Sequence, residues 1–391
     1  MVLKKNDLKE LEVIKAKTPP VLSLYVLTNP ADPDVAQYTF DFKKKPYVIR
    51  AKDTLKALGV PEALSRRVLD RLEHDAPQAV TRAIFAGEDF LEVYDLGVEL
   101  PVMDLKTGLV EARWGEPYVA PLFFALDEFE PYAVVLLDQE RWRLFEVFMN
   151  QIEEVEDAFR AVAPEEWREL KESAPAVPKG QGYAAAARGG AAKDKFHRRL
   201  LEWTNRFYKK LATELERFVN ERGIERVILV GPEPDTKHFE SFLSKALRPK
   251  VVGHVGAPGG GRVAPSAVLA AVRPLIAEVE RAEETRLLDE VREKGIWGAG
   301  EVLRALQEGR VYLWVLPWRL DLEVYYCPEE KFAALSEAEA RAVCAAPERR
   351  PLKDLVDELA AVYGARLEFV RGEAEKRLTT EFGGMAGLVR W

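Results

Sequence analysis

Cysteine and histidine are scarce in this chain. The two cysteines, Cys327 and Cys344, are too few for a disulfide scaffold or for an all-cysteine zinc site. The four histidines are scattered and show no metal-binding spacing such as H-E-x-x-H. We therefore expect neither a bound metal nor a cofactor.

Long apolar runs are also missing. No stretch approaches the roughly 18 consecutive apolar residues of a membrane-spanning helix. The N-terminus becomes charged at Lys4 and Lys5, so it lacks the apolar region of a secretory signal. These features predict a cytoplasmic protein without membrane contact.

An excess of positive charge is absent as well. The formal net charge is −8 and the isoelectric point is near 5.4. This balance argues against a protein that coats nucleic acid indiscriminately, because phosphate binding requires clustered Lys and Arg, but it leaves room for a local basic patch. At about 150 residues per domain, the 391 residues predict two to three domains.

The hydrophobic pattern predicts an α/β protein with three domains. Residues 1–118 are expected to form a small α/β domain, in which one strand and two helices precede a hairpin over 81–96. Residues 119–255 are expected to form a second α/β domain with a mixed sheet. Its strands at 132–137 and 142–148 are joined by a tight turn, which predicts an antiparallel portion.

The last domain is predicted to cover residues 263–391. It follows the glycine-rich linker Gly253–Ser266. Helices and strands alternate through it, which is typical of an α/β/α sandwich with a parallel or mixed sheet.

The segment 179–199 carries the strongest functional signal. We expect a loop here, because its four glycines permit positive φ angles, followed by a helix from Asp194 to Arg222. From Arg188 to Lys210 there are eight Lys or Arg residues against two acids, a local net charge of +6. The amides at such a helix start favour a phosphate. The alternative is an ordinary surface loop before a basic helix face.

Three separate motifs resemble one family. The order Arg188-Gly189-Gly190-Ala191-Ala192-Lys193-Asp194-Lys195-Phe196 is similar to the GGQ loop of the archaeo-eukaryotic class-1 peptide-chain release factors. The segment 298–311 (GAGEVLRALQEGRV) and the C-terminal segment 382–391 (FGGMAGLVRW) resemble two elements of that family's C-terminal domain. The chain is therefore identified as a bacterial-type member of the release factor and Pelota superfamily, with the resemblance covering about residues 120–391.

The resemblance implies a tRNA-shaped protein of three domains. The middle domain would carry the loop, and the C-terminal domain would have the fold of the ribosomal proteins L7Ae and L30e. In the family, that domain meets a translational GTPase or another ribosomal partner. Some relatives hold zinc there with a C-P-x-C-G motif, of which this chain keeps only the first thiol, Cys327.

Ala191 stands where the family has the glutamine that helps to position the hydrolytic water. A methyl group neither donates nor accepts a hydrogen bond, so this contribution is lost. A backbone amide at 190 or 191 remains as a substitute, and His197 is a candidate general base or a polar member of an RNA-facing helix. The N-I-K-S decoding element of true release factors is absent from the first domain. Stop-codon reading is therefore not predicted.

The first domain contains a second candidate RNA contact. Aromatic residues between Tyr38 and Tyr47 flank the lysines Lys43, Lys44 and Lys45. Aromatic rings stack on unpaired bases while lysines meet phosphates. The alternative is a strand with a solvated basic end.

The sequence thus predicts a ribosome-binding factor that occupies the A site in hibernation or rescue, probing near the peptidyl transferase centre and P-site tRNA without hydrolysing peptidyl-tRNA. Two alternatives stay open, a peptidyl-tRNA hydrolase acting on stalled ribosomes and an interaction protein without a ribosomal role. The residues predicted to contact RNA are Arg188, Gly189, Gly190, Ala191, Lys193, Lys195, His197, Arg198, Arg199, Lys43, Lys44 and Lys45.

Overall fold

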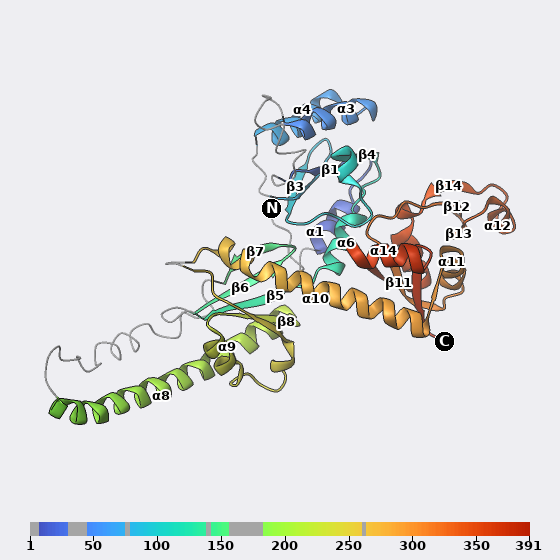
Figure 1. Ribbon diagram of the computed structural model, residues 1–391. Coiled ribbons are helices and arrows are strands. Elements are labelled where there is room, and N and C mark those ends of the chain that lie inside the picture. Colours follow the sequence, from blue (N-terminus) through green and yellow to red (C-terminus); the bar gives the residue numbers. More distant parts are fainter. Residues whose placement is uncertain (1–7, 30–44, 75–78, 138–141, 156–182, 260–262) are drawn as a thin grey trace. The chain divides into compact units, whose positions relative to one another are not determined.

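The computed structural model describes residues 8–29, 45–74, 79–137, 142–155, 183–259 and 263–391 (Figure 1). At 8, 106, 107, 183–201 and 203 it describes the backbone alone. The chain divides into two compact units, one made of residues 1–129 and 277–391 and the other of residues 130–276. Among the described helices, none combines the length and the apolar character needed to cross a membrane.

The N-terminal part of the first unit is built on an antiparallel sheet of order β3-β2-β1-β4. The predicted hairpin is confirmed, since β2 and β3 pair along their whole length. Helices α3 and α4 cover one face of the sheet, and the core between them includes Val48, Val68 and Ile84. The elements are α1 (Leu8–Lys15), β1 (Val21–Leu27), α3 (Pro46–Ala57), α4 (Glu62–His74), β2 (Thr81–Ala86), β3 (Leu91–Leu96), α5 (Leu105–Gly108), β4 (Val110–Gly115) and α6 (Ala120–Glu128).

The second unit contains a sheet of order β7-β6-β5-β8-β9. Strands β5 and β6 pair antiparallel as predicted, and β7 pairs antiparallel with β6. Strands β5, β8 and β9 pair parallel, so the sheet is mixed. The bounds are β5 (Tyr132–Leu137), β6 (Trp142–Phe148), β7 (Gln151–Glu154), α8 (Tyr183–Arg222), β8 (Arg226–Val230), α9 (Glu233–Glu240) and β9 (Val251–Val255). Helix α9 and strand β9 were not predicted from the sequence.

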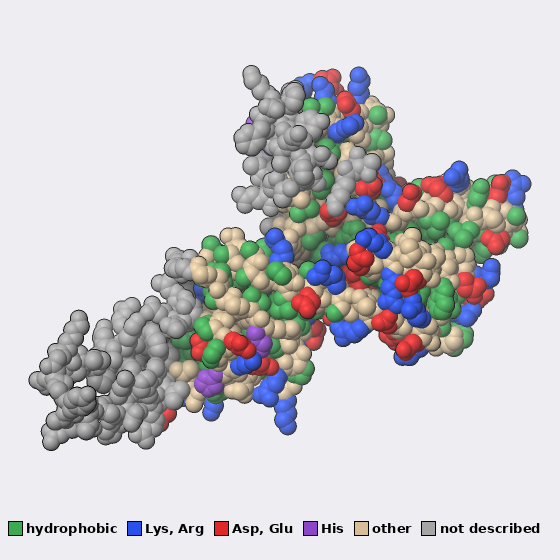
Figure 2. Space-filling model, viewed as in Figure 1, with side chains coloured by type: hydrophobic (Ala, Val, Ile, Leu, Met, Phe, Trp, Pro, Cys, Tyr) green, Lys and Arg blue, Asp and Glu red, His purple; other side chains and the backbone are tan. Residues whose placement is uncertain are grey.

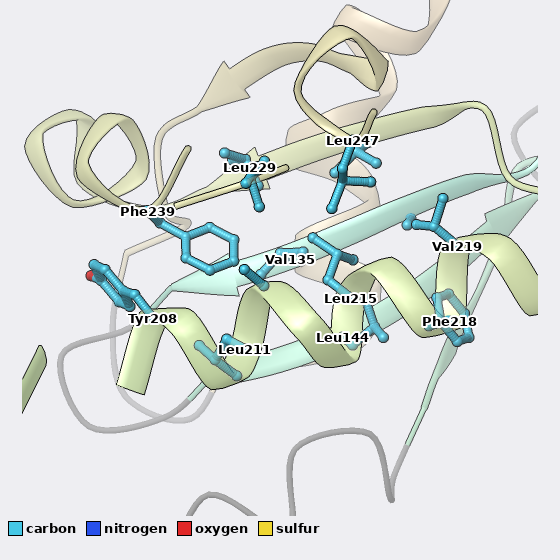
Figure 3. Close-up of a cluster of buried hydrophobic side chains, with 14 of the residues drawn as sticks. Val135, Leu144, Tyr208, Leu211, Leu215, Phe218, Val219, Leu229, Phe239 and Leu247 are labelled. Atoms are coloured by element: carbon cyan, nitrogen blue, oxygen red, sulfur yellow. The ribbon is translucent and has the colours of Figure 1, made fainter. Parts of the chain in front are cut away.

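Helices lie on both faces of this sheet. Strand β5 directs Ala133, Val135 and Leu137 toward α8 and α9 (Figure 3). The alternate residues of β5 face the start of α10 (Pro265–Lys294), where Val268 and Val272 are fully buried. This period of two is what a strand buried on both faces requires. The apolar side chains on one face of β5 hold α8 against the sheet.

Helix α8 corrects the prediction of a loop at 179–199. Residues 179–182 lie outside the described residues, but from Tyr183 onward the backbone is one helix of 40 residues, which includes Gly189 and Gly190. The reason is local propensity. Alanine is the best helix former, and Ala184–Ala187 with Ala191 and Ala192 surround the two glycines, which cost about 1 kcal/mol each relative to alanine. The prediction of a loop followed from the glycines and did not take the helix propensity of the alanines into account.

The C-terminal part of the first unit contains two sheets. A mixed sheet of order β10-β16-β11-β15 has the alternation predicted from the sequence, and a small sheet of order β13-β12-β14 stands beside it. The elements are β10 (Gly295–Trp297), α11 (Ala299–Gln307), β11 (Val311–Pro317), β12 (Glu323–Cys327), β13 (Phe332–Ala334), α12 (Glu337–Arg341), β14 (Glu348–Pro351), α13 (Val356–Tyr363), β15 (Arg366–Val370), α14 (Gly372–Glu381) and β16 (Ala386–Val389). The α/β fold class is confirmed.

The two ends of the chain fold together in the first unit. The Val102 N–H donates to the Trp318 carbonyl at 2.8 Å, and the Arg113 guanidinium meets the Asp354 carboxylate at 2.5 Å. The residues predicted as a linker, Gly253–Ser266, instead begin inside β9 and end inside α10. The boundary between the units falls within α10, after residue 276.

Candidate nucleic-acid interface

The predicted contact residues of the middle of the chain lie on α8. The backbone of residues 188–199 is helical, and its twelve residues rise along ~16 Å of the helix axis. The side chains predicted to bind RNA there, those of Arg188, Lys193, Lys195, His197, Arg198 and Arg199, lie outside the described residues. The structure therefore places these residues on one element, and their role stays a prediction.

The helical backbone bears on the chemistry of Gly190 and Ala191. In an α-helix, the N–H of each interior residue bonds to the carbonyl four residues earlier. The amides of residues 190 and 191 are thus engaged with their own helix, and neither is free to orient a water molecule. The predicted helix start at Asp194, with its unpaired amides, is likewise wrong, since α8 begins at Tyr183.

The lysines of the first domain are only partly described. Lys43 and Lys44 lie outside the described residues. The Lys45 ammonium donates to the Leu72 carbonyl at 3.2 Å and lies 5.7 Å from the centre of the Tyr47 ring. Tyr47 is buried in the core, which corrects the suggestion that its ring stacks on a base. Lys45 thus joins α3 to α4.

Three described cations continue the predicted basic run along α8. Arg206, Lys209 and Lys210 are exposed. Arg206 lies three residues before Lys209 and four before Lys210, which are the spacings of neighbours on a helix surface. Among the residues whose side chains the structure describes, none forms an ion pair or hydrogen bond with these three charged groups. These three residues contribute to the local charge of +6 but are not among the residues predicted to contact RNA.

The next cations along α8 differ in that each has an acidic partner. Arg217 contacts Glu214 at 2.7 Å and Glu221 at 3.5 Å. The hydrogen bond that Arg217 donates to Glu214 and the charges of both carboxylates raise the pKa of Arg217. Arg222 contacts Glu146 at 3.1 Å. The cations near the C-terminal end of α8 are therefore paired with carboxylates, whereas Arg206, Lys209 and Lys210 have no acidic partner among the described residues.

Aromatic side chains on α8 next to the three unpaired cations pack against the rest of the second unit. Phe207 packs on Trp142 with ring centres 3.7 Å apart, and Tyr208 meets the rings of His238 and Phe239 edge-on at 5.4 and 5.3 Å. Burial, aided by the charge of Asp235, raises the pKa of Tyr208 to about 12, so the hydroxyl stays neutral. Figure 3 shows Tyr208 beside Phe239 of α9 and Leu211 on the side of α8 that packs against the sheet. The three exposed cations therefore lie outside this packed core.

The described surface elsewhere mixes charges of both signs. On the face shown in Figure 2, basic and acidic side chains are interspersed rather than gathered by sign. Exposed ion pairs within the described residues, such as Lys237–Glu233 at 2.6 Å, agree with this mixing. The open cations of α8 contrast with that pattern.

The two cysteines are joined to each other. Cys327 and Cys344 form a disulfide with their Cα atoms 6.0 Å apart, and the Glu330 carboxylate lies within 4.8 Å of both sulfur atoms. This single bond was not predicted, because two cysteines 17 residues apart in a sequence do not indicate whether the fold brings them together. In this state neither sulfur is a thiolate that can bind a metal.

Comparison with known proteins agrees with the resemblance seen in the motifs. Residues 117–276 match the family described as "Bacterial archaeo-eukaryotic release factor family 10". The chain is 27% identical over 197 residues to a protein pelota homolog of Methanopyrus kandleri, and this match spans 48% of the chain and about half (49%) of the relative. The similarity to the archaeo-eukaryotic release factors and Pelota is thereby confirmed.

The chain also has similarity to solved structures. The chain is similar to Pelota of Archaeoglobus fulgidus, with 15% identity, a TM-score of 0.34 and coverage of 80% of this chain and 79% of that one. It is also similar to Dom34 of S. cerevisiae, a translation termination-like factor, with 10% identity, a TM-score of 0.38 and the same coverage.

Proposed function

We propose that this chain is a ribosome-binding factor of the release factor and Pelota type, which presents the basic side of α8 to ribosomal or transfer RNA in the A site. The observation that carries the proposal is the cluster Arg206, Lys209 and Lys210, which is exposed and has no acidic partner among the described residues. The cluster lies inside residues 117–276, the part of the chain that matches the release factor family.

Phosphate is the ligand that suits such a cluster. Adjacent like charges three and four residues apart destabilise an isolated helix by about 0.2–0.5 kcal/mol per pair, and a bound phosphate backbone removes this repulsion. Each neutralised phosphate also releases counterions, which gives binding a strong salt dependence. Because the aromatic residues of α8 pack against the sheet and α9, the positions of these charges are fixed relative to the second unit.

The proposed role is occupancy of the ribosome in hibernation or rescue, without hydrolysis of peptidyl-tRNA. Two observations support the absence of hydrolysis. The Ala191 side chain has no hydrogen-bonding group, and the helical amides of residues 190 and 191 are bonded within α8. The hydrolase alternative predicts peptide release from stalled ribosomes. Our proposal predicts none, and release abolished by bulky residues at 189 and 190 would favour the hydrolase.

A GTPase partner forms the further part of the proposal. The resemblance of the C-terminal segments 298–311 and 382–391 to the release factor C-terminal domain supports a contact between that region and a translational GTPase. Pull-down of a purified GTPase with the full chain, in the presence and absence of ribosomes, tests this contact.

Co-sedimentation with 70S ribosomes over a range of salt concentrations tests the central proposal. We expect the variant with Arg206, Lys209 and Lys210 changed to alanine to bind more weakly. The slope of log K against log[salt] should fall by about two to three units, since each lost phosphate contact removes 0.7–0.9. The matched control is Arg217→Ala, which removes a cation that is already paired and should leave the slope unchanged. Equal slopes for the wild type and the triple variant would overturn the proposal, as would no ribosome binding at all.

A further inference from the structure

The small sheet β13-β12-β14, with α12, has very little core of its own. Its buried cluster consists of Cys327, Ala334 and Ala340, with Cys344 and two aromatic residues partly buried against it. So few apolar contacts rarely hold a small unit, and natural proteins add a cross-link in such cases. The Cys327–Cys344 bond supplies that link, closing the chain around β13 and α12.

Strands β12 and β13 are attached to the larger sheet domain by hydrogen bonds. The Gln307 amide pairs with the backbone of Ala333, donating to its carbonyl at 3.0 Å and accepting from its N–H at 2.6 Å. The Tyr326 hydroxyl donates to Glu358 at 2.5 Å. The disulfide therefore ties the segment that follows α12 to an anchored strand.

The two cysteines differ in exposure. Cys327 is fully buried, whereas Cys344 is only partly buried. An incoming thiolate thus reaches the sulfur of Cys344, and Cys327 is the leaving group. The exposed Glu330 carboxylate, within 4.8 Å of both sulfurs, opposes the approach of an anion and disfavours the departing thiolate.

We propose that the Cys327–Cys344 pair is a reversible redox site whose reduction by a dithiol loosens β13 and α12. The first thiolate of the reductant attacks the Cys344 sulfur, which breaks the S–S bond, forms a mixed disulfide and releases the Cys327 thiolate. The second thiol of the reductant then displaces Cys344 and leaves as its own disulfide. Two electrons and two protons pass from the dithiol to the two cysteines, which become thiols.

Hydrogen exchange of the full chain with and without dithiothreitol tests this site, together with mass-spectrometric counting of alkylated cysteines. We expect no alkylated cysteine in the untreated, denatured protein and both cysteines alkylated after reduction. Exchange of amides in residues 332–344 should become about tenfold faster or more on reduction, while β11 stays unchanged as the internal control. Two alkylated cysteines before treatment, or equal exchange in both states, would overturn the proposal.

Two sets of variants separate this site from a general loss of structure. The double variant Cys327→Ser with Cys344→Ser should show the exchange of the reduced wild type whether or not reductant is present. Glu330→Gln should speed reduction by dithiothreitol, and Glu329→Gln, the neighbouring exposed acid, is the matched control. Equal reduction rates for Glu330→Gln and the wild type would contradict the role given to that carboxylate. None of these readouts involves the ribosome, so the result is independent of the proposed function.

Discussion

At the residue scale, one cluster of acids stands out in the first unit. Glu284 on α10 is nearly buried, one of its oxygens has no hydrogen-bond partner among the described atoms, and the other lies 3.7 Å from Arg371. Arg371 also contacts Glu280, and Glu128 accepts from the Phe369 amide at 3.1 Å. Burial raises the pKa of Glu284 to about 7, with Glu280 and Glu368 adding to the rise and Arg371 opposing it, and burial raises the pKa of Glu128 as well.

Because of this cluster, we expect the free energy of unfolding to fall as the pH rises. An acid whose pKa is higher in the folded chain than in the unfolded one, where it is near 4.5, favours the folded state while it is protonated. For Glu284 that contribution is lost between about pH 4.5 and pH 7 and amounts to roughly 1–3 kcal/mol. Urea unfolding at pH 5 and pH 8 measures the difference.

Glu284→Gln should flatten the pH dependence and raise the free energy of unfolding at pH 8 by a similar ~1–3 kcal/mol, because it removes a buried charge but keeps a hydrogen-bonding group. Glu278→Gln, on the exposed side of the same helix, is the control and should leave the profile unchanged. A Glu284→Gln profile parallel to the wild type would contradict the pKa assignment.

At the scale of the element, α8 decides how the basic run is presented. Gly189 and Gly190 are its weakest points, since glycine costs about 1 kcal/mol relative to alanine in a helix interior. Gly189→Ala and Gly190→Ala should therefore each stabilise the first turns of α8 by about that amount, which slows amide exchange over residues 184–192 severalfold. Ala185→Gly is the reverse control and should speed exchange. Unchanged exchange in both alanine variants would show that this segment is not helical in solution.

The sequence predicted most strands and helices of the described chain, because strongly periodic apolar segments such as Val227–Val230 and Leu211–Val219 have few alternatives. Short elements such as β13 and α12 were missed, since three to five residues carry too little pattern. The loop at 179–199 was wrong because glycine spacing outweighed alanine content in the prediction. The three family motifs can be recognised from the sequence alone. Which cations of α8 are paired, as Arg217 is with Glu214 and Glu221, is known only from the side-chain positions in the folded chain.

At the scale of the whole molecule, the first and last parts of the chain form one compact unit. Arg113 links them, since its guanidinium stacks 3.3 Å from the centre of the Tyr118 ring and pairs with Asp354, whose side chain is only 16% exposed. Lys353 and Glu111 add a second ion pair at 3.0 Å. The chain must therefore complete its last segment before the first is fully stable.

Arg113→Ala should destabilise the chain by roughly 1–3 kcal/mol, because it leaves Asp354 partly buried without its main partner. Hydrogen exchange should become faster both in β4 and in β15, which lie far apart in the sequence. Arg66→Ala breaks an exposed pair within α4 and should cost less than about 0.5 kcal/mol. Faster exchange confined to β4 would contradict a shared unit.

The proposed function depends on contact between the unpaired cations of α8 and RNA phosphates on the ribosome. Acetylation footprinting of lysines in the presence and absence of 70S ribosomes tests this most directly, because it reads each ammonium separately. We predict that Lys209 and Lys210 are protected by the ribosome, while Lys376, which is paired with Glu373 in the other unit, reacts equally in both samples. Full reactivity of Lys209 and Lys210 in the ribosome-bound chain would contradict the account.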